Sequence, residues 1–448
     1  MFITNRGEIE GRLDPIFHHP LYKQLEEKLK QASSQLDYLS NYIISFDTGK
    51  NLPQTDEGIP YLRTQNVRMI FPTLEDVSYV ADTTNIKKTQ NGDLLFVRVG
   101  VGVGDCCVIS ENEANSAFSD NVIRIKLKPG INPYYVATYL STYIGRNLFF
   151  KGLKGSGKPV ISRENIDAIV LPILSTETQS KIQADIFAAT TQYNGKLSEA
   201  ATMIHKVDFT IAKLIGFEFP EIVDKKTFVT KISELENRID PHFYLPGFKD
   251  LIDNIRQINH AQLGDVVEFS NETWNQKDGF ENEFPYIEIS EIDLTSGKIQ
   301  NISYIPISEA PSRARMVIRT NDIIVSSTRP HRGAIAFINE QQNGFIASTG
   351  FAVLRKLLRA DISKEYLFYI LRTQICLQQM LQRSSGGSYP AITTEELKKI
   401  FIPIPSPEVQ QQIVVDIKAF IDKAEALKAE AKQDLEKAKQ EIEALILS

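Results

Sequence analysis

The chain has 448 residues, which is too many for one compact core and fits two to four domains. Its composition (42% hydrophobic, 24% charged) is ordinary for a globular protein, and no apolar run approaches the roughly 20 residues of a membrane helix. The first residues lack the features of a signal peptide, and the three cysteines offer neither a disulfide framework nor zinc-ligand spacing, so we expect a cytoplasmic protein. The net charge of -6 argues against a wholly basic DNA-binding surface but leaves room for a local one.

The first predicted region covers residues 1–175 and is rich in short strands. Residues 93–99 and 122–127 are apolar runs separated by Gly, Asn, Asp and Pro, a pattern typical of strands and turns. At Asn132-Pro133 the pattern predicts the start of a short helix. The residues that share one face of this helix are Tyr135, Val136, Tyr139, Leu140 and Ile144.

A long helix is predicted over residues 176–216. Apolar residues recur at steps of mostly three and four without a proline, as in a helix with a coiled-coil seam. The seam residues are Ile182, Ile186, Ala189, Tyr193, Leu197, Ala200, Ile204, Val207, Ile211 and Leu214. A second long helix with interleaved Lys and Glu is predicted over residues 407–448. Its seam residues are Ile413, Ile417, Phe420, Ala424, Leu427, Ala431, Leu435, Ala438, Ile442 and Leu445.

The two halves of the chain repeat each other. Residues 12–17 (Arg-Leu-Asp-Pro-Ile-Phe) recur at 238–243 (Arg-Ile-Asp-Pro-His-Phe), and residues 171–173 (Leu-Pro-Ile) recur at 402–404 (Ile-Pro-Ile). Gln179 and Ile182 correspond to Gln410 and Ile413 in the second half. Strand-like runs match too: residues 60–64 with 285–289, 92–96 with 321–325, and 104–108 with 333–337. Such a duplication predicts two equivalent halves about a two-fold axis, with the long helices antiparallel, and duplex DNA is a two-fold partner.

With these motifs the chain resembles the specificity subunits of bacterial type I restriction-modification enzymes over nearly its whole length. The stretch that leads into the second long helix, residues 401–413 (Phe-Ile-Pro-Ile-Pro-Ser-Pro-Glu-Val-Gln-Gln-Gln-Ile), is similar to the family's proline-rich start of a spacer helix. The first copy departs from it, because Leu174 replaces the second proline and Ser180 the second glutamine. The family's Gly-Asp element with a later glycine is present from Gly92-Asp93 to Gly104, and as Asn321-Asp322 to Gly333.

The resemblance implies an α+β fold of two mixed α/β target recognition domains separated by two long antiparallel coiled-coil helices. We expect recognition domains at residues 1–175 and 217–406, and helical spacers at 176–216 and 407–448. The implied function is to read a bipartite double-stranded DNA target without catalysis or a cofactor. The implied partners are two adenine-methylating modification subunits, which use S-adenosylmethionine, and ATP-dependent restriction (translocase) subunits. The alternatives are a free-standing coiled-coil adaptor and an S-adenosylmethionine-dependent methyltransferase.

Three motifs that suggest an enzyme are incomplete. Residues 152–158 (Gly-Leu-Lys-Gly-Ser-Gly-Lys) are similar to a phosphate-binding loop, but Pro159 replaces the Ser or Thr that would hold Mg²⁺. Residues 100–104 (Gly-Val-Gly-Val-Gly) precede a strand-like run and not a helix, so we expect a hairpin connection. Residues 132–135 (Asn-Pro-Tyr-Tyr) lack the second proline of the adenine methyltransferase motif, and no catalytic or metal cluster is evident among the six histidines.

For DNA contact we expect polar and aromatic residues in the loops between strands. Arg can bridge guanine O6 and N7, and Asn or Gln can pair with adenine. In the first half the candidates are Arg63, Gln65, Asn66, Arg68, Arg98, Lys154 and Lys158. In the second half they are Trp274, Asn275, Gln276, Lys277, Arg313, Arg315, Arg329, His331, Arg332 and Tyr389.

Overall fold

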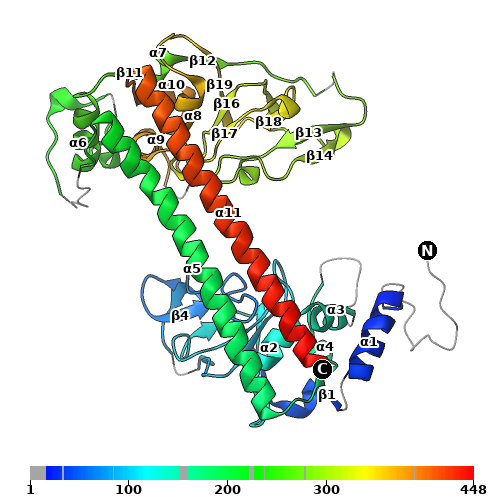
Figure 1. Cartoon of the computed structure of the whole chain (residues 1–448). Coiled ribbons are helices and arrows are strands. Elements are labelled where there is room, and N and C mark those ends of the chain that lie inside the picture. Colours follow the sequence, from blue (N-terminus) through cyan, green and yellow to red (C-terminus); the bar gives the residue numbers. More distant parts are fainter. Residues whose placement is uncertain are drawn as a thin grey trace. The chain divides into compact units, whose positions relative to one another are not determined.

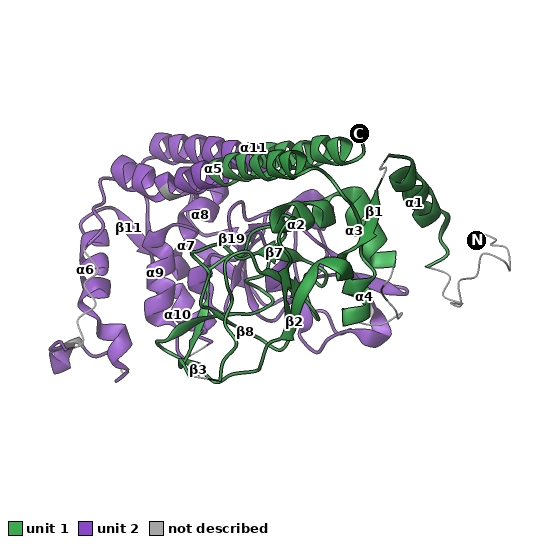
Figure 2. Cartoon of the chain, turned by 90° about the horizontal axis from the view of Figure 1, so that it is seen from below, with its two compact units in different colours: residues 1–196, 429–448 green, residues 197–428 purple. Residues whose placement is uncertain are grey.

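The computed structural model describes residues 17–32, 35–83, 85–151, 153, 159–220, 227–236, 238–276, 279–387 and 389–448 (Figure 1). The chain divides into two compact units, which Figure 2 colours separately. Unit 1 contains Met1–Lys196 and Ala429–Ser448, and unit 2 contains Leu197–Lys428. Both units combine sheets with helices, so the expected mixed α/β character is confirmed.

The described residues of unit 1 form two four-stranded sheets and one strand pair. The first sheet is antiparallel throughout, in the order β2 (Ile43–Thr48), β9 (Val122–Leu127), β6 (Leu94–Val97), β7 (Cys106–Val108). Strands β6 and β7 are buried along their whole length, which explains their unbroken apolar runs. The second sheet has the order β3 (Gln54–Thr55), β5 (Ser78–Val80), β4 (Ile59–Leu62), β8 (Ala117–Phe118), with β4 and β8 parallel. The antiparallel pair is β1 (Leu36–Tyr38) with β10 (Val170–Pro172).

Unit 2 repeats this plan. Its antiparallel sheet has the order β12 (Val267–Ser270), β19 (Phe351–Leu357), β16 (Ile323–Ser326), β17 (Ile335–Phe337). Its second sheet has the order β14 (Ser303–Pro306), β13 (Glu283–Ile287), β18 (Ile346–Ser348), β15 (Ala314–Val317), and β13 is parallel to β18 as β4 is to β8. The pair β11 (His260–Gln262) with β20 (Phe401–Pro403) corresponds to β1 with β10.

The short helices also occur in matching places. Unit 1 has α1 (Pro20–Ala32), η2 (Leu39–Tyr42), α2 (Pro133–Ser141), α3 (Tyr143–Lys151) and α4 (Arg163–Asp167). Unit 2 has α6 (Pro246–Ile255), α7 (Leu263–Val266), α8 (Lys364–Leu371), α9 (Gln374–Arg383) and α10 (Thr394–Lys398). Its single-turn helices are η3 (Ile232–Glu234), η4 (Pro241–Tyr244), η5 (Ile289–Glu291), η6 (Ile307–Glu309), η7 (Pro330–Arg332) and η8 (Glu340–Gln342).

The helix predicted to begin at Asn132-Pro133 is confirmed, but it is shorter than expected. The Asn132 side chain accepts a hydrogen bond from the Tyr134 N–H (2.9 Å), and Pro133 lies in the first turn. Thr142 is extended and ends α2, so Ile144 belongs to α3 and not to the same helix. The Thr142 hydroxyl lies 2.7 Å from the Tyr139 carbonyl, to which it donates, and this local bond competes with continuation of the helix.

The two long helices are α5 (Thr176–Ile215) and α11 (Pro407–Ile446), each 40 residues long. Within unit 1 the first half of α5 runs antiparallel to the end of α11: Lys196 bonds Glu430 and Asp434 (2.6 Å each). There Ile182 and Ile186 share a core with Ile442 and Ile446. Within unit 2, Ile211 and Ala212 of α5 share a core with Ile413, Ile417 and Ile421 of α11. None of the helices among the described residues is both long and apolar enough to cross a membrane.

Candidate nucleic-acid interface

A buried aspartate fixes the start of the central strand of the antiparallel sheet in each unit. Asp93 accepts a hydrogen bond from the Gln90 N–H (2.8 Å), and Asp322 accepts one from the Arg319 N–H (2.8 Å). Both carboxylates are 1% exposed and face an arginine from the neighbouring strand. The Arg355 guanidinium bonds Asp322 at 2.9 Å, whereas Arg124 lies 3.6 Å from Asp93. Burial raises the pKa of Asp93 above its ordinary value, because desolvation outweighs the neighbouring cations there.

The strand that follows each aspartate leads into a hairpin turn. Residues 98–105 join β6 to β7, and residues 327–334 join β16 to β17, so the hairpin predicted for the glycine-rich stretch is confirmed. A second loop closes on each turn in the same way. The Ile161 N–H donates to the Arg98 carbonyl (3.0 Å), and the Ile392 N–H donates to the Ser327 carbonyl (2.8 Å). The two halves therefore present equivalent turns on equivalent frames.

The turn in unit 2 brings three of the predicted residues together with a fourth from the second loop. The Arg329 guanidinium carbon lies 4.2 Å from the centre of the Tyr389 ring, and Tyr389 is 71% exposed. His331 and Arg332 follow on the same turn. Burial and the two neighbouring guanidinium groups lower the pKa of His331 below its ordinary value, so its imidazole is neutral at pH 7. This cluster combines fixed positive charge with an aromatic surface.

Many arginines elsewhere in the two units are paired with carboxylates, whereas Arg372 bonds backbone carbonyls. The arginines that form such pairs are Arg124, Arg146, Arg163, Arg238, Arg256, Arg319, Arg355, Arg359 and Arg383. In the part of the chain that the structure describes, no ion pair is formed by six of the predicted arginines. These are Arg63, Arg68, Arg98, Arg313, Arg315 and Arg332. In a chain with more acids than bases, exposed cations left without a carboxylate are suited to phosphate or base edges.

The loop that follows β4 contains four predicted residues, of which one has a structural role. The Asn66 side chain is fully buried, donates to the carbonyls of Thr73 and Glu75 (3.0 and 3.3 Å), and accepts from the Arg63 N–H (3.0 Å). Asn66 is therefore a loop-shaping residue, because its amide would have to break these bonds to reach a base. Gln65 and Arg68 are exposed, and the Gln65 side chain donates to the Asp76 carbonyl (3.2 Å).

In unit 2 the predicted stretch 274–277 is partly structural. Trp274 is 7% exposed and packs in a core with Phe284, so its ring is not offered to a base. The Gln276 amide donates to the carbonyls of Pro311 and Ala314 (2.8 and 3.2 Å), which shapes the loop. Asn275 is exposed. Arg313 and Arg315 are exposed on either side of the buried Ala314, at the start of β15.

Lys154, Lys158 and Lys277 lie outside the described residues, as does most of the loop similar to a phosphate-binding loop. Arg98 is described: it is half-buried at the end of β6, with one guanidinium nitrogen 3.5 Å from the Asp120 carbonyl. Within the described residues no group of three or more His, Cys, Asp or Glu side chains is placed to hold a metal ion.

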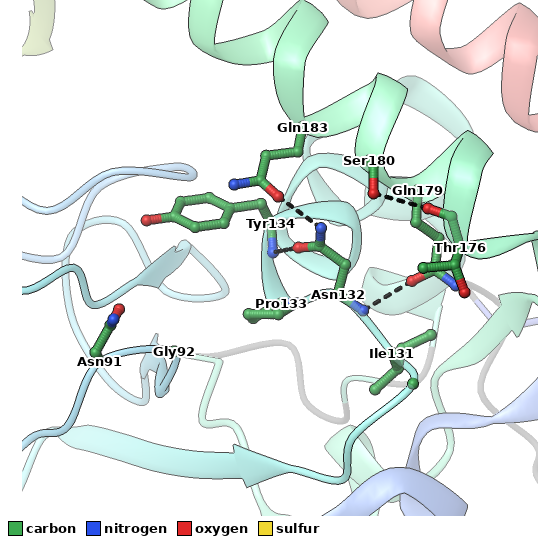
Figure 3. A pocket seen from close by; sticks show the side chains of 11 residues that line it. Asn91, Gly92, Ile131, Asn132, Pro133, Tyr134, Thr176, Gln179, Ser180 and Gln183 are labelled. Carbon is green, nitrogen blue, oxygen red and sulfur yellow. Dashed lines mark hydrogen bonds between the residues drawn. The ribbon is translucent and has the colours of Figure 1, made fainter.

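An open cavity of about 380 Å³ lies where α2 begins beside α5 (Figure 3). Asn132 lines it, but its amide is occupied: one atom caps α2 and the other donates to Gln183 (2.7 Å). The Asn132 N–H donates to the Gln179 side chain (2.7 Å). The residues similar to a methyltransferase motif therefore join the helix start to α5. The sequence analysis used Gln179 and Gln410 as landmarks of the repeat but missed this role, for which the recurrence of a glutamine at the same place in both halves was the available signal.

The chain is similar to DNA-specificity subunits of type I restriction enzymes. The sequence profile described as "Type I restriction modification DNA specificity domain" matches residues 257–437. The MjaVIII specificity subunit of Methanocaldococcus jannaschii is 24% identical over 395 residues, which cover 87% of this chain and 85% of that one. The HindI specificity subunit of Haemophilus influenzae is 27% identical over 150 residues, 33% of this chain and only 32% of the relative's length. A crystal structure of a type I S subunit from M. genitalium aligns with 92% of this chain and 94% of its own, at 13% identity and a TM-score of 0.37.

Proposed function

We propose that this chain, which belongs to the family of type I restriction-modification specificity subunits, reads a double-stranded DNA target in two parts. Each half of the chain would read one half-site. The observation that carries the proposal is the pair of equivalent frames on which the surface turns differ. Each frame holds arginines that, among the described residues, have no carboxylate partner. Because the two units share their sheets but differ in the side chains of their surface turns, we expect the two half-sites to differ in sequence.

The layout that we propose has recognition domains at residues 1–175 and 217–406 and helical spacers at 176–216 and 407–448. The antiparallel contacts of α5 with α11 inside each unit support spacers that pair as a coiled coil. The matching sheet orders of the two units support a pseudo-two-fold repeat. The spacer length would then set the number of unread base pairs between the half-sites.

We further propose that the chain contributes recognition and not chemistry. Two modification subunits would methylate adenine with S-adenosylmethionine, and ATP-dependent restriction subunits would join the same assembly. The structural role of Asn132, in the stretch similar to a methyltransferase motif, supports this division of labour. By itself the chain should bind DNA weakly and methylate nothing, since phosphate contacts are few on an acidic protein.

The test is an exchange of one recognition domain. The chain is purified with its modification subunit, residues 1–175 are replaced by those of a relative, and the modified adenines are mapped by sequencing. We expect one half-site to change and the other to stay the same. The matched control exchanges residues 217–406 and should change only the other half-site. If both half-sites changed in either exchange, or if the chain alone methylated adenine, the proposal would be wrong.

A further inference from the structure

The turn between β16 and β17 holds an arginine where the other half of the chain has a glycine. The two turns, 98–105 and 327–334, have the same length, which places Arg329 opposite Gly100 and Gly333 opposite Gly104. Gly100 has φ +99° and Arg329 has φ +48°, so both backbones are left-handed. Glycine adopts this conformation freely, whereas a residue with a Cβ is disfavoured in it. The backbone therefore favours glycine at position 329, and the arginine side chain must serve another purpose.

Backbone contacts hold this turn in place. The Arg329 N–H donates to the Pro390 carbonyl (2.7 Å), and Thr328 forms a β-bridge with Ala391. Pro330, the next residue, is buried. The turn and the loop that carries Tyr389 are thus joined at Thr328 and at Arg329 itself. Its side chain starts from a fixed point on the surface.

The Tyr389 ring limits the orientation of the Arg329 side chain. A guanidinium group 4.2 Å from the centre of an aromatic ring is held by cation–π attraction. A guanidinium group is a planar fork of N–H donors. This fork matches guanine O6 and N7 in the major groove better than it matches any other base edge. Arg332, exposed on the same turn and without an ion pair in the described part of the chain, is placed for a phosphate.

We infer that Arg329, held over the Tyr389 ring, determines specificity for a guanine in the half-site read by the second recognition domain. Tyr389 is a positioning residue that acts through Arg329. The inference rests on the proposed function and specifies one base of the target, a guanine, and the residue that reads it, Arg329. The first recognition domain, with Gly100 in the equivalent place, has no counterpart to this contact.

The test measures modification by the full complex of the chain with its modification subunit. Rates are compared on synthetic duplexes that carry each of the four base pairs at every position of the second half-site. We expect the unaltered complex to require a guanine at one position. In Arg329→Gly the preference for that guanine should fall about ten- to a hundred-fold, while preferences at all other positions remain. Because glycine suits the left-handed backbone, the melting temperature should not fall.

Three further variants separate recognition from structure. Tyr389→Phe keeps the ring and should keep the guanine preference, whereas Tyr389→Ala should lose part of it. Arg359→Lys is the matched control, since Arg359 is paired with Asp361 away from the turn, and it should change nothing. A uniform loss of rate on all duplexes in Arg329→Gly would make Arg329 a phosphate contact and overturn the inference. A second half-site without a required guanine would also overturn it, while leaving the proposed function intact. An unaltered complex that modified no duplex selectively would instead refute the proposed function itself.

Discussion

Asp322 gives the sharpest test of what holds unit 2 together. Its carboxylate is 1% exposed and accepts from the Arg319 N–H (2.8 Å), from Arg355 Nη2 (2.9 Å) and from Arg355 Nε (3.1 and 3.2 Å to its two oxygens). In Asp322→Asn the Arg355 guanidinium loses this buried carboxylate and keeps Glu272 and the Val317 carbonyl. Breaking a buried ion pair costs about 3–5 kcal/mol, and we expect the lower value because Arg355 is partly exposed.

The assay uses the tryptophan that the sequence provides. Trp274 is the one tryptophan of the chain and lies in a core of unit 2, so its fluorescence reports the unfolding of that unit. With an m value of about 3 kcal/mol/M in urea, a loss of about 3 kcal/mol moves the midpoint down by about 1 M. Asp361→Asn is the matched control, since it breaks an exposed pair with Arg359 and should leave the midpoint unchanged. An equal midpoint shift in the two variants, or none in Asp322→Asn, would refute the reasoning.

Three further predictions follow from the same frame. Gln410→Ala should lower the same urea midpoint by the equivalent of about 3 kcal/mol, because the Ser363 N–H loses its acceptor and two carbonyls lose their donor. The folded-state pKa of Asp93 lies above its unfolded value, so stability is lost as pH rises from the ordinary pKa of 3.8 through the raised one. In Asp93→Asn the stability of unit 1, measured by circular dichroism, should depend less on pH in this range. An unchanged pH dependence would contradict the assigned cause. Four residues inserted into each long helix, beside the facing residues Lys196 and Asp434, add about 6 Å and should add roughly two unread base pairs to the mapped target; an unchanged spacing in an active variant would mean that the helices do not set it.

The elements of the fold could be predicted where a strong local pattern meets no competing interaction. The long helices were predicted within a residue or two because their seam is uninterrupted and Gly216 adopts a left-handed φ of 68° just after α5. The break between α2 and α3 was not predicted, since it depends on one hydroxyl of Thr142 and on Gly145, whose Cβ would lie 2.0 Å from the Tyr139 carbonyl oxygen. Apolar periodicity carries no information about either contact.

The candidate site could be predicted by residue type but not by residue role. The sequence does not distinguish an exposed arginine from a buried one. Arg355 differs from Arg332 because it forms ion pairs, and these join strands that are distant in sequence. Asn66 and Trp274 were predicted as DNA contacts because amides and aromatic rings in loops often bind DNA. In the structure the Asn66 side chain bonds backbone carbonyls, and the Trp274 ring packs in a core. These competing partners are supplied by tertiary structure, which a single sequence does not display.

Some residues that the two halves share have their partners inside the fold. The Tyr135 hydroxyl donates to the Pro172 carbonyl (2.6 Å), and the Tyr366 hydroxyl donates to the Pro403 carbonyl (2.9 Å), so either tyrosine is fixed by a bond that a change would leave unmade. The turns at 98–105 and 327–334 face a different constraint. Each turn needs a left-handed residue and a closing strand contact, and the backbone supplies both. The left-handed position of such a turn can hold glycine, as at Gly100, or arginine, as at Arg329, where the unfavourable φ is the cost to the backbone. A frame of this kind lets each half acquire a different target while its core stays the same.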